Sequence, residues 1–173
     1  MPEKRTSKSV KKNGGFHSKA FKEGIASLMD EIQLAFQWSR PSILVAVHKG
    51  SAGQEKARSK LKQEIEATGR KVQSIEADKG NLNVIQTILK SPNRANSVFF
   101  ISGINRNGET ERHNIYRALN FQREMLVENR IVLVFWLAMR EAAELPSMAP
   151  DFWAFRHRVV EFAPDRSTNK LTS

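Results

Sequence analysis

Two short polar segments hold the side chains best suited to chemistry. The segment HKGSAGQ follows the apolar run ILVAV, and the segment SGINRNGE follows the run SVFFI. In open α/β sheets, ligands bind beyond the carboxyl ends of the strands, and backbone N–H groups at the start of a helix can hold an anion. The two segments therefore supply four ligand-binding candidates, which are His48, Lys49, Ser51 and Ser102.

Neither segment completes a nucleotide-binding motif. A phosphate loop needs a Gly-Lys-Ser/Thr step that enters the helix, whereas Lys49 precedes the glycines of HKGSAGQEKA. The run VFFISG also lacks the carboxylate that would anchor Mg²⁺, and the nearest acids, Glu109 and Glu111, belong to a polar loop. These two gaps argue against ATP hydrolysis, and we expect no cofactor.

Other catalytic arrangements lack their residues as well. The chain has no Cys, its four His are scattered, and no Ser stands in a G-x-S-x-G elbow, which disfavours zinc sites and hydrolase triads. Glu64 and Glu66 diverge on a helix, so they do not form the carboxylate pair of a metal nuclease. We therefore assign no catalytic residue and no metal ligand. A TIR-like or nucleotide-processing enzyme stays open as a second alternative, with His48 as its acid–base candidate.

Positive charge is concentrated at the N-terminus. The formal net charge is +10, and residues 1–22 hold seven Lys or Arg against the single acid Glu3. Residues 1–15 have almost no apolar content, so we expect a disordered tail there. Basic tails bind nucleic acid through its phosphates. Nucleic-acid association is therefore an alternative function, through Lys4, Arg5, Lys8, Lys11 and Lys12.

The apolar pattern predicts the elements that would position these residues. The runs SILVAV, KVQSIEA, SVFFIS, IVLVFWLA and VVEF are typical of strands, and the segments between them have helical spacing. This alternation predicts a mostly parallel, doubly wound α/β sheet of about five strands, Rossmann-like or P-loop NTPase-like, with an N-terminal helix. The expected organisation is a tail at 1–15, the helix at 16–40, the α/β domain at 41–163 and a flexible tail at 164–173.

Local signals predict where individual helices begin and end. Ser51 suits the N-cap of the helix after the first strand, and Gly69 suits its C′ position. Pro146 predicts a break within MREAAELPSM, and Pro150 suits the first turn of a new helix.

The stretch APDFWAFRHRVVEF is predicted mainly to close the fold. Phe152 and Phe155 are three residues apart on the new helix and can face the sheet together. In the alternative interpretation, Arg156, His157 and Arg158 contact a phosphate group or the acidic residues of a partner protein. Arg123, which stands off the apolar face of the preceding long helix, has the same two interpretations.

The segments RALNFQREML, IVLVFWL and APDFWAFRHRVVEF occur in this order along the chain. Together they resemble the C-terminal half of STAND-type NTPase domains of bacterial signalling and defence proteins, especially relatives that lack the P-loop and often precede tetratricopeptide repeats. The resemblance implies a non-catalytic regulatory or protein-interaction module. Its partner would be an effector, a sensor or a repeat domain, and a homo-oligomer stays open. The matching positions are Leu119, Asn120, Arg123, Glu124, Trp136, Ala149, Pro150, Asp151, Phe152, Arg156 and Phe162.

No segment of the sequence suits a bilayer. The longest apolar runs, ILVAV and IVLVFWLAM, are far shorter than the roughly 20 residues that a membrane span needs. No apolar stretch follows the basic N-terminus, so it does not have the pattern of a secretory signal. Together with the lack of Cys, this predicts a cytoplasmic protein that does not contact a membrane.

Overall fold

The computed structural model describes residues 18–163, so the five basic tail candidates, Lys4 to Lys12, lie outside the described residues. The helices are α1 (Lys19–Gln37), α2 (Ser51–Ala67), α3 (Val84–Lys90), α4 (Glu109–Glu128), α5 (Met139–Met148) and α6 (Pro150–Ala154). The strands are β1 (Ser42–His48), β2 (Lys71–Glu76), β3 (Ser97–Ser102), β4 (Val132–Ala138) and β5 (Arg158–Phe162). Two short 3₁₀ helices, η1 (Arg94–Asn96) and η2 (Ile104–Arg106), flank β3.

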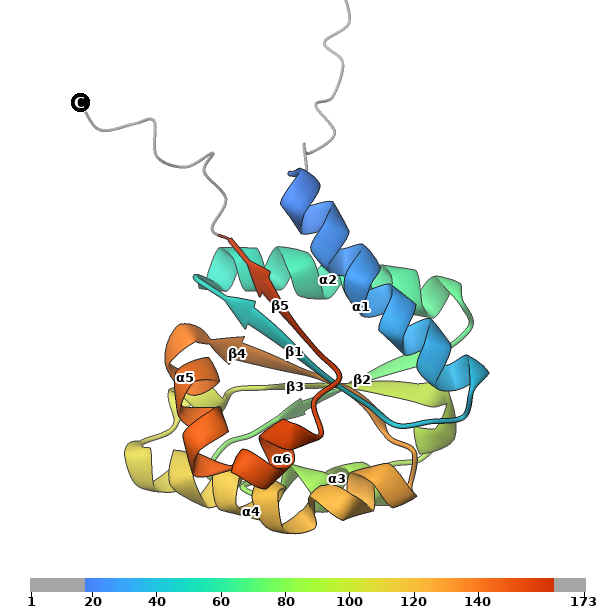
Figure 1. Cartoon of the computed structure of the whole chain (residues 1–173). Helices are drawn as coiled ribbons and strands as arrows, with labels where there is room; N and C mark the ends of the chain where they lie inside the picture. Colours follow the sequence, from blue (N-terminus) through green and yellow to red (C-terminus); the bar gives the residue numbers. More distant parts are fainter. Residues whose placement is uncertain (1–17, 164–173) are drawn as a thin grey trace, which may run out of the picture.

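The strands pair in parallel, in the order β2-β3-β4-β1-β5. Helices α1 and α2 cover one face of this sheet, and α3 to α6 cover the other (Figure 1). The predicted α/β class, with a parallel Rossmann-like sheet and an N-terminal helix, is confirmed. Strands β1 and β3 are buried at every residue. Both of their faces are covered by helices, which is why their sequences are almost continuously apolar.

Alternate residues of the central strands pack into two separate cores. In β1, Val45 and Val47 join the core beneath α3 to α6, whereas Leu44 and Ala46 join the core beneath α1 and α2. Burial of each large aliphatic or aromatic side chain contributes roughly 1.5–3 kcal/mol. The two cores therefore hold the carboxyl ends of the strands in fixed positions.

Helix α1 shares a core with the sheet. Ser18 caps its start, because the Ser18 hydroxyl accepts a hydrogen bond from the Phe21 amide at 3.2 Å. Gly24 allows a close approach to β5, since a Cβ atom at this position would lie only 2.9 Å from the ring of Phe162. The N-terminal helix is therefore packed tightly against the last strand.

The two ends of α2 differ in how well the sequence predicted them. Gly69 has a positive φ of 85° directly after the C-cap residue, as expected for the C′ position. The N-cap prediction is wrong, because the residue in that place is Gly50 and Ser51 is the first helical residue. The Gly50 carbonyl already accepts the first intrahelical bond, from the Gln54 amide at 3.2 Å.

Helix α5 does not break at Pro146, contrary to the prediction. It continues to Met148, and α6 begins at Pro150 as expected. A proline inside a helix removes one donor, but the next turn still closes, because the Ala149 amide donates to the Leu145 carbonyl at 2.9 Å.

Candidate functional site

The carboxyl ends of β1 and β4 mark the position in this fold where a ligand would be expected. The two strands are neighbours, and His48 at the end of β1 is paired with Ala138 at the end of β4. Helix α2 leaves β1 toward one face of the sheet, and α5 leaves β4 toward the other (Figure 1). This is a topological switch point, the place where open α/β sheets bind their ligands. We call it the β1/β4 crevice and define it by His48, Gly50, Ser51 and Glu141.

His48 is the buried base of the β1/β4 crevice. Its residue is 6% exposed, and its Nδ1 atom has no hydrogen-bond partner among the described residues. Burial lowers the pKa of His48 below the ordinary value, and the charge of Arg58 adds to this effect. A contact with the Gly50 backbone and the charge of Glu141 act in the opposite direction. Burial therefore favours the neutral form of the imidazole.

Glu141 is the second buried polar side chain of the crevice, and the sequence analysis did not identify it. It stands in the first turn of α5 and is 1% exposed. Its Oε1 atom accepts a hydrogen bond from Arg140 Nε at 3.0 Å, whereas its Oε2 atom has no partner in the described part of the chain. The Arg140 side chain is half exposed and also donates to the Asn105 carbonyl at 3.2 Å. Glu141 is thus a buried carboxylate with one oxygen in use.

Ser102 lies two strands away from His48 and already has a partner. Its hydroxyl donates to Glu76 Oε1 at 3.0 Å, which joins the ends of β3 and β2. The other Glu76 oxygen forms an ion pair with Arg106 in η2. Gly103 follows Ser102 with a φ of 88°, and a Cβ atom there would clash with the Glu76 carboxylate. The hydroxyl of the predicted candidate Ser102 is therefore already used in a contact between β3 and β2.

A buried polar cluster ties α4 to α5 next to the crevice. Arg112 donates to both carboxylate oxygens of Glu144, each at 3.0 Å, and Tyr116 donates to Glu144 Oε2 at 2.7 Å. Arg112 lowers the pKa of Glu144, and burial together with the Glu144 contact raises the pKa of Tyr116. Arg112 also donates to the backbone carbonyl of Asn107. The side-chain amide of Asn107 in turn donates to the backbone carbonyl of Ala77 at 2.7 Å. The cluster fixes the helix that carries Glu141.

Arg123 lies on α4 and Arg156 lies just after α6, away from the crevice. Arg123 donates to the Asn120 carbonyl at 2.6 Å, and its Nη1 lies 3.9 Å from an oxygen of Asp151. Arg156 lies over the ring of Trp153 at 4.5 Å and donates to its carbonyl. The structure therefore separates the six candidates into a group at the carboxyl edge of the sheet and these two arginines.

The two residues after Arg156 also contact other parts of the fold. The Ile43 amide donates to Nδ1 of His157 at 3.0 Å, and the His157 amide donates back to the Ile43 carbonyl at 2.8 Å. Arg158 pairs with Glu31 of α1 at 3.1 Å. The Arg-His-Arg run thus holds the start of β5 against β1 and α1.

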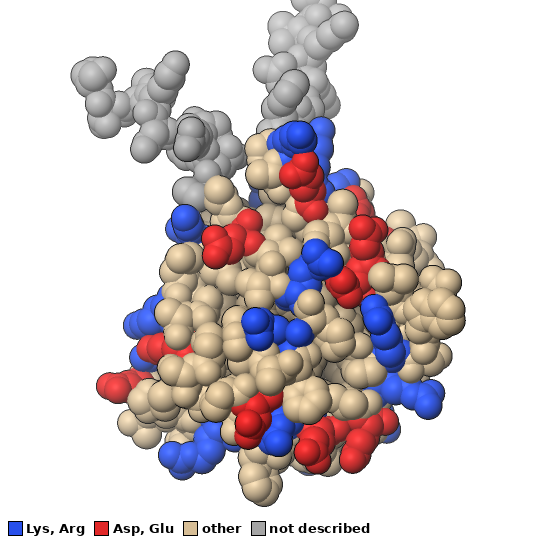
Figure 2. All heavy atoms as spheres, in the orientation of Figure 1, with Lys and Arg blue, Asp and Glu red and all other residues tan. Residues whose placement is uncertain are grey.

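Lys49 and Ser51 are exposed at the mouth of the crevice. The space above this loop is open, since a Cβ atom on Gly50 would meet no atom within 4 Å. Over the visible face of the molecule, Lys and Arg are interspersed with Asp and Glu (Figure 2). This face therefore does not carry the broad basic surface that would favour nucleic acid.

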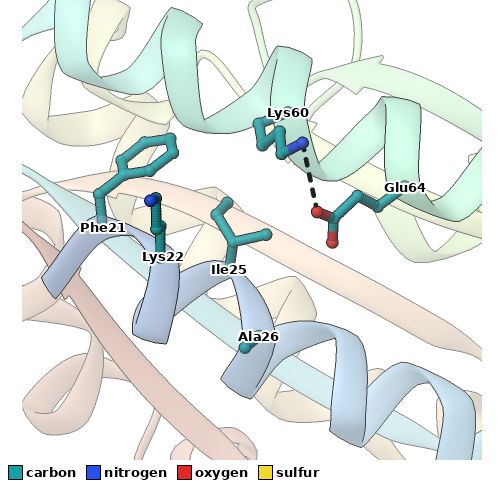
Figure 3. A pocket seen from close by; sticks show the side chains of 6 residues that line it. All are labelled: Phe21, Lys22, Ile25, Ala26, Lys60 and Glu64. Atoms are coloured by element: carbon teal, nitrogen blue, oxygen red, sulfur yellow. Dashed lines mark ion pairs between the residues drawn. The ribbon is translucent and has the colours of Figure 1, made fainter. Parts of the chain in front are cut away.

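A separate groove lies between α1 and α2, with a volume of about 280 Å³. Figure 3 shows its lining, in which Phe21, Ile25 and Ala26 of α1 face α2. Across the groove, Lys60 of α2 forms an ion pair with Glu64 at 3.5 Å. Lys22 completes the lining. We call this feature the α1–α2 groove.

Searches for similar proteins did not reveal a family. No family model matches the chain, and no curated protein matches it significantly. Within residues 18–163, no group of three or more His, Asp or Glu is arranged to hold a metal ion. None of the helices that the structure describes is long and apolar enough to cross a membrane. Hypotheses about function therefore rest on the crevice, the groove and the surface.

Proposed function

We propose that this chain is a non-catalytic regulatory or protein-interaction module of a bacterial signalling or defence system, similar to STAND-type NTPase domains that lack the Walker residues. The observation that carries the proposal is the character of the β1/β4 crevice. Two buried polar side chains, Glu141 and His48, stand at the ends of β4 and β1, the edge at which open α/β sheets bind ligands.

These two side chains are poorly matched to a phosphate group. A carboxylate can only accept hydrogen bonds, as a phosphate also does, so Glu141 offers an anion no bond. The neutral His48 brings no positive charge, and Lys49 precedes the helix instead of projecting from its first turn. On the neighbouring strands, Glu76 is already bound to Ser102 and Arg106. The nearest cation to the buried pair, Arg140, is already bound to Glu141, and no lysine enters the first turn of α2 as in a phosphate loop.

The fold and the surface also support a binding role. The five-stranded parallel sheet with helices on both faces has the α/β class that the resemblance implies. Two large aromatic side chains are exposed, Trp38 by 67% just after α1 and Phe121 by 84% on α4. Exposed aromatic residues are enriched at the centres of protein–protein interfaces. Exposed aromatic side chains of this kind are suited to contact another protein.

Isothermal titration calorimetry of the full chain with ATP, ADP and GTP in the presence of Mg²⁺ tests the proposal. We expect no binding at micromolar ligand concentrations, in the wild type and in a Ser102→Ala variant. Micromolar affinity for ATP would overturn the proposal. Nucleotide or NAD turnover that is lost in His48→Ala, but kept in the surface variant Ser147→Ala, would instead establish the enzyme alternative.

A further inference from the structure

We infer that the β1/β4 crevice binds a small neutral compound through adjacent hydroxyl groups, of the kind that a sugar or the ribose of a nucleoside carries. The inference rests on the proposed function, because it names the ligand class of a regulatory module whose crevice does not hold phosphates. Three features support it: two buried polar atoms without a partner, the uncapped start of α2, and the position of these groups around the end of β1.

Two side chains of the crevice are buried and each has an unused polar atom. Glu141 is 1% exposed and His48 is 6% exposed. Neither Oε2 of Glu141 nor Nδ1 of His48 has a hydrogen-bond partner within residues 18–163. A buried polar group that stays unpaired costs free energy, which a ligand with matching groups recovers when it binds. Because both side chains stand at the switch point of the sheet, their unused atoms mark a binding site there.

The unused atoms decide the chemistry of the ligand. Glu141 Oε1 is taken by Arg140 at 3.0 Å, so Oε2 is the atom that needs a donor, and an anion brings none. Nδ1 of a neutral imidazole donates or accepts, according to which ring nitrogen holds the proton. A hydroxyl group both donates and accepts, so it satisfies the carboxylate and either form of the ring.

The charges around the crevice favour a neutral ligand over an amine. Arg140 already compensates the charge of Glu141, and the charge of Arg58 lowers the pKa of His48. The positive end of the α2 dipole lies at Ser51 and repels a cation. Moving an ammonium group out of water to these buried atoms also costs far more than moving a hydroxyl group.

The start of α2 supplies donors for the oxygens of the same ligand. The first intrahelical bond runs from the Gln54 amide to the Gly50 carbonyl at 3.2 Å. The amides of residues 51–53 precede this bond, so they have no partner within the helix. Gly50 caps the helix without a side chain that could accept from them, and a Cβ atom there would meet no atom within 4 Å. A hydroxyl oxygen can accept from these amides.

The groups lie around the end of β1, where one small molecule can contact several of them. Val47 packs beneath α3 to α6, so strand alternation places His48 toward α1 and α2, whereas Glu141 belongs to α5 on the other face. Neighbouring strands lie about 4.8 Å apart, and the charge of Glu141 acts on the pKa of His48. A compound with adjacent hydroxyl groups can bond to both sides, which a single ion cannot do.

Titrations of the full chain followed by ¹H–¹⁵N NMR test the inference. The probes are ribose and adenosine, which carry adjacent hydroxyl groups as a free sugar and as a nucleoside. Their deoxy forms, which lack these hydroxyl pairs, are the matched references, and the diamine putrescine is the cationic alternative. We expect saturable shifts at the amides of residues 51–53 at millimolar concentrations of ribose, adenosine or both. The deoxy forms and putrescine should give none.

Two pairs of variants connect binding to the named groups. Glu141→Gln should weaken binding about tenfold, as expected for a lost hydrogen bond to a charged group, and the exposed Glu128→Gln on α4 should not. Ser51→Pro removes one free amide at the first helical position, where proline is tolerated, and should weaken binding about threefold. Ser51→Ala keeps the amide and should not. If Glu141→Gln does not fold, the comparison at Ser51 decides.

The outcomes separate this inference from the proposed function. Binding of ribose supports a free sugar, and binding of adenosine alone supports a nucleoside. Absence of saturable shifts, equal binding of the deoxy forms, binding of putrescine, or no effect of Ser51→Pro would each overturn the inference. Any of these results with no ATP binding in calorimetry would leave the proposed function standing, whereas micromolar ATP affinity would overturn the proposed function itself.

Discussion

Replacing Tyr116 by Phe tests whether the buried cluster beside the crevice holds α4 and α5 together. The substitution removes one hydroxyl, which donates to Glu144 at 2.7 Å, and keeps the ring, which is fully buried. A hydrogen bond to a charged group contributes about 1.5–3 kcal/mol. Glu144 keeps both bonds from Arg112, and its side chain is 24% exposed, so water can replace part of the loss. We therefore expect a loss near the lower limit, about 1.5–2 kcal/mol.

Urea unfolding followed by tryptophan fluorescence measures this loss. With a typical dependence on urea of about 1–3 kcal/mol per molar, the midpoint should fall by roughly 1 M. The control is Ser147→Ala on α5, which removes an exposed hydroxyl and should change the free energy of unfolding by less than about 0.5 kcal/mol. An unchanged midpoint in Tyr116→Phe would refute the assigned hydrogen bond.

The same cluster can be observed spectroscopically, because Tyr116 is the single tyrosine of the sequence. Burial first, and the hydrogen bond to Glu144 second, raise its pKa above the ordinary value of 10.0. Tyrosinate absorbance should therefore stay absent in the folded chain well above pH 10. In Glu144→Gln the pKa of Tyr116 should decrease but remain raised, because burial persists. Ionisation of the folded wild type near the ordinary value would contradict the buried geometry.

Three further substitutions test how the last strand and its neighbours are held. Burial and the charge of Arg40 lower the pKa of His157 in the folded chain. The stability that its neutral ring contributes should therefore be complete above pH 6.5 and be lost as the pH falls through the lowered pKa. His157→Gln should flatten this part of a pH–stability profile. Asn120→Ala removes the side-chain acceptor at the start of α6 and should cost about 1 kcal/mol in chemical unfolding. Gly24→Ala should lower the melting temperature through its clash with β5, whereas Gly53→Ala, which meets no atom closer than 4.0 Å, should not.

The fold could be predicted because its signals are local. The runs SILVAV and SVFFIS are apolar at almost every position, which indicates strands covered on both faces. The helix break predicted at Pro146 was wrong because a single proline does not by itself decide where a helix ends. The cost of a proline depends on how many following bonds the helix still forms, and α5 needs only one more turn.

The candidate site was predictable only in part. His48 and Ser102 could be found because they end apolar strands, and the rule for parallel sheets places such ends at one edge. Glu141 resembles any acid in the first turn of a helix, and its burial depends on how α5 docks beside β4. Arg158 stands in a conspicuous basic run, but its pair with Glu31 depends on the turn that brings β5 back beside α1. Such contacts between distant elements have no signature in the local sequence.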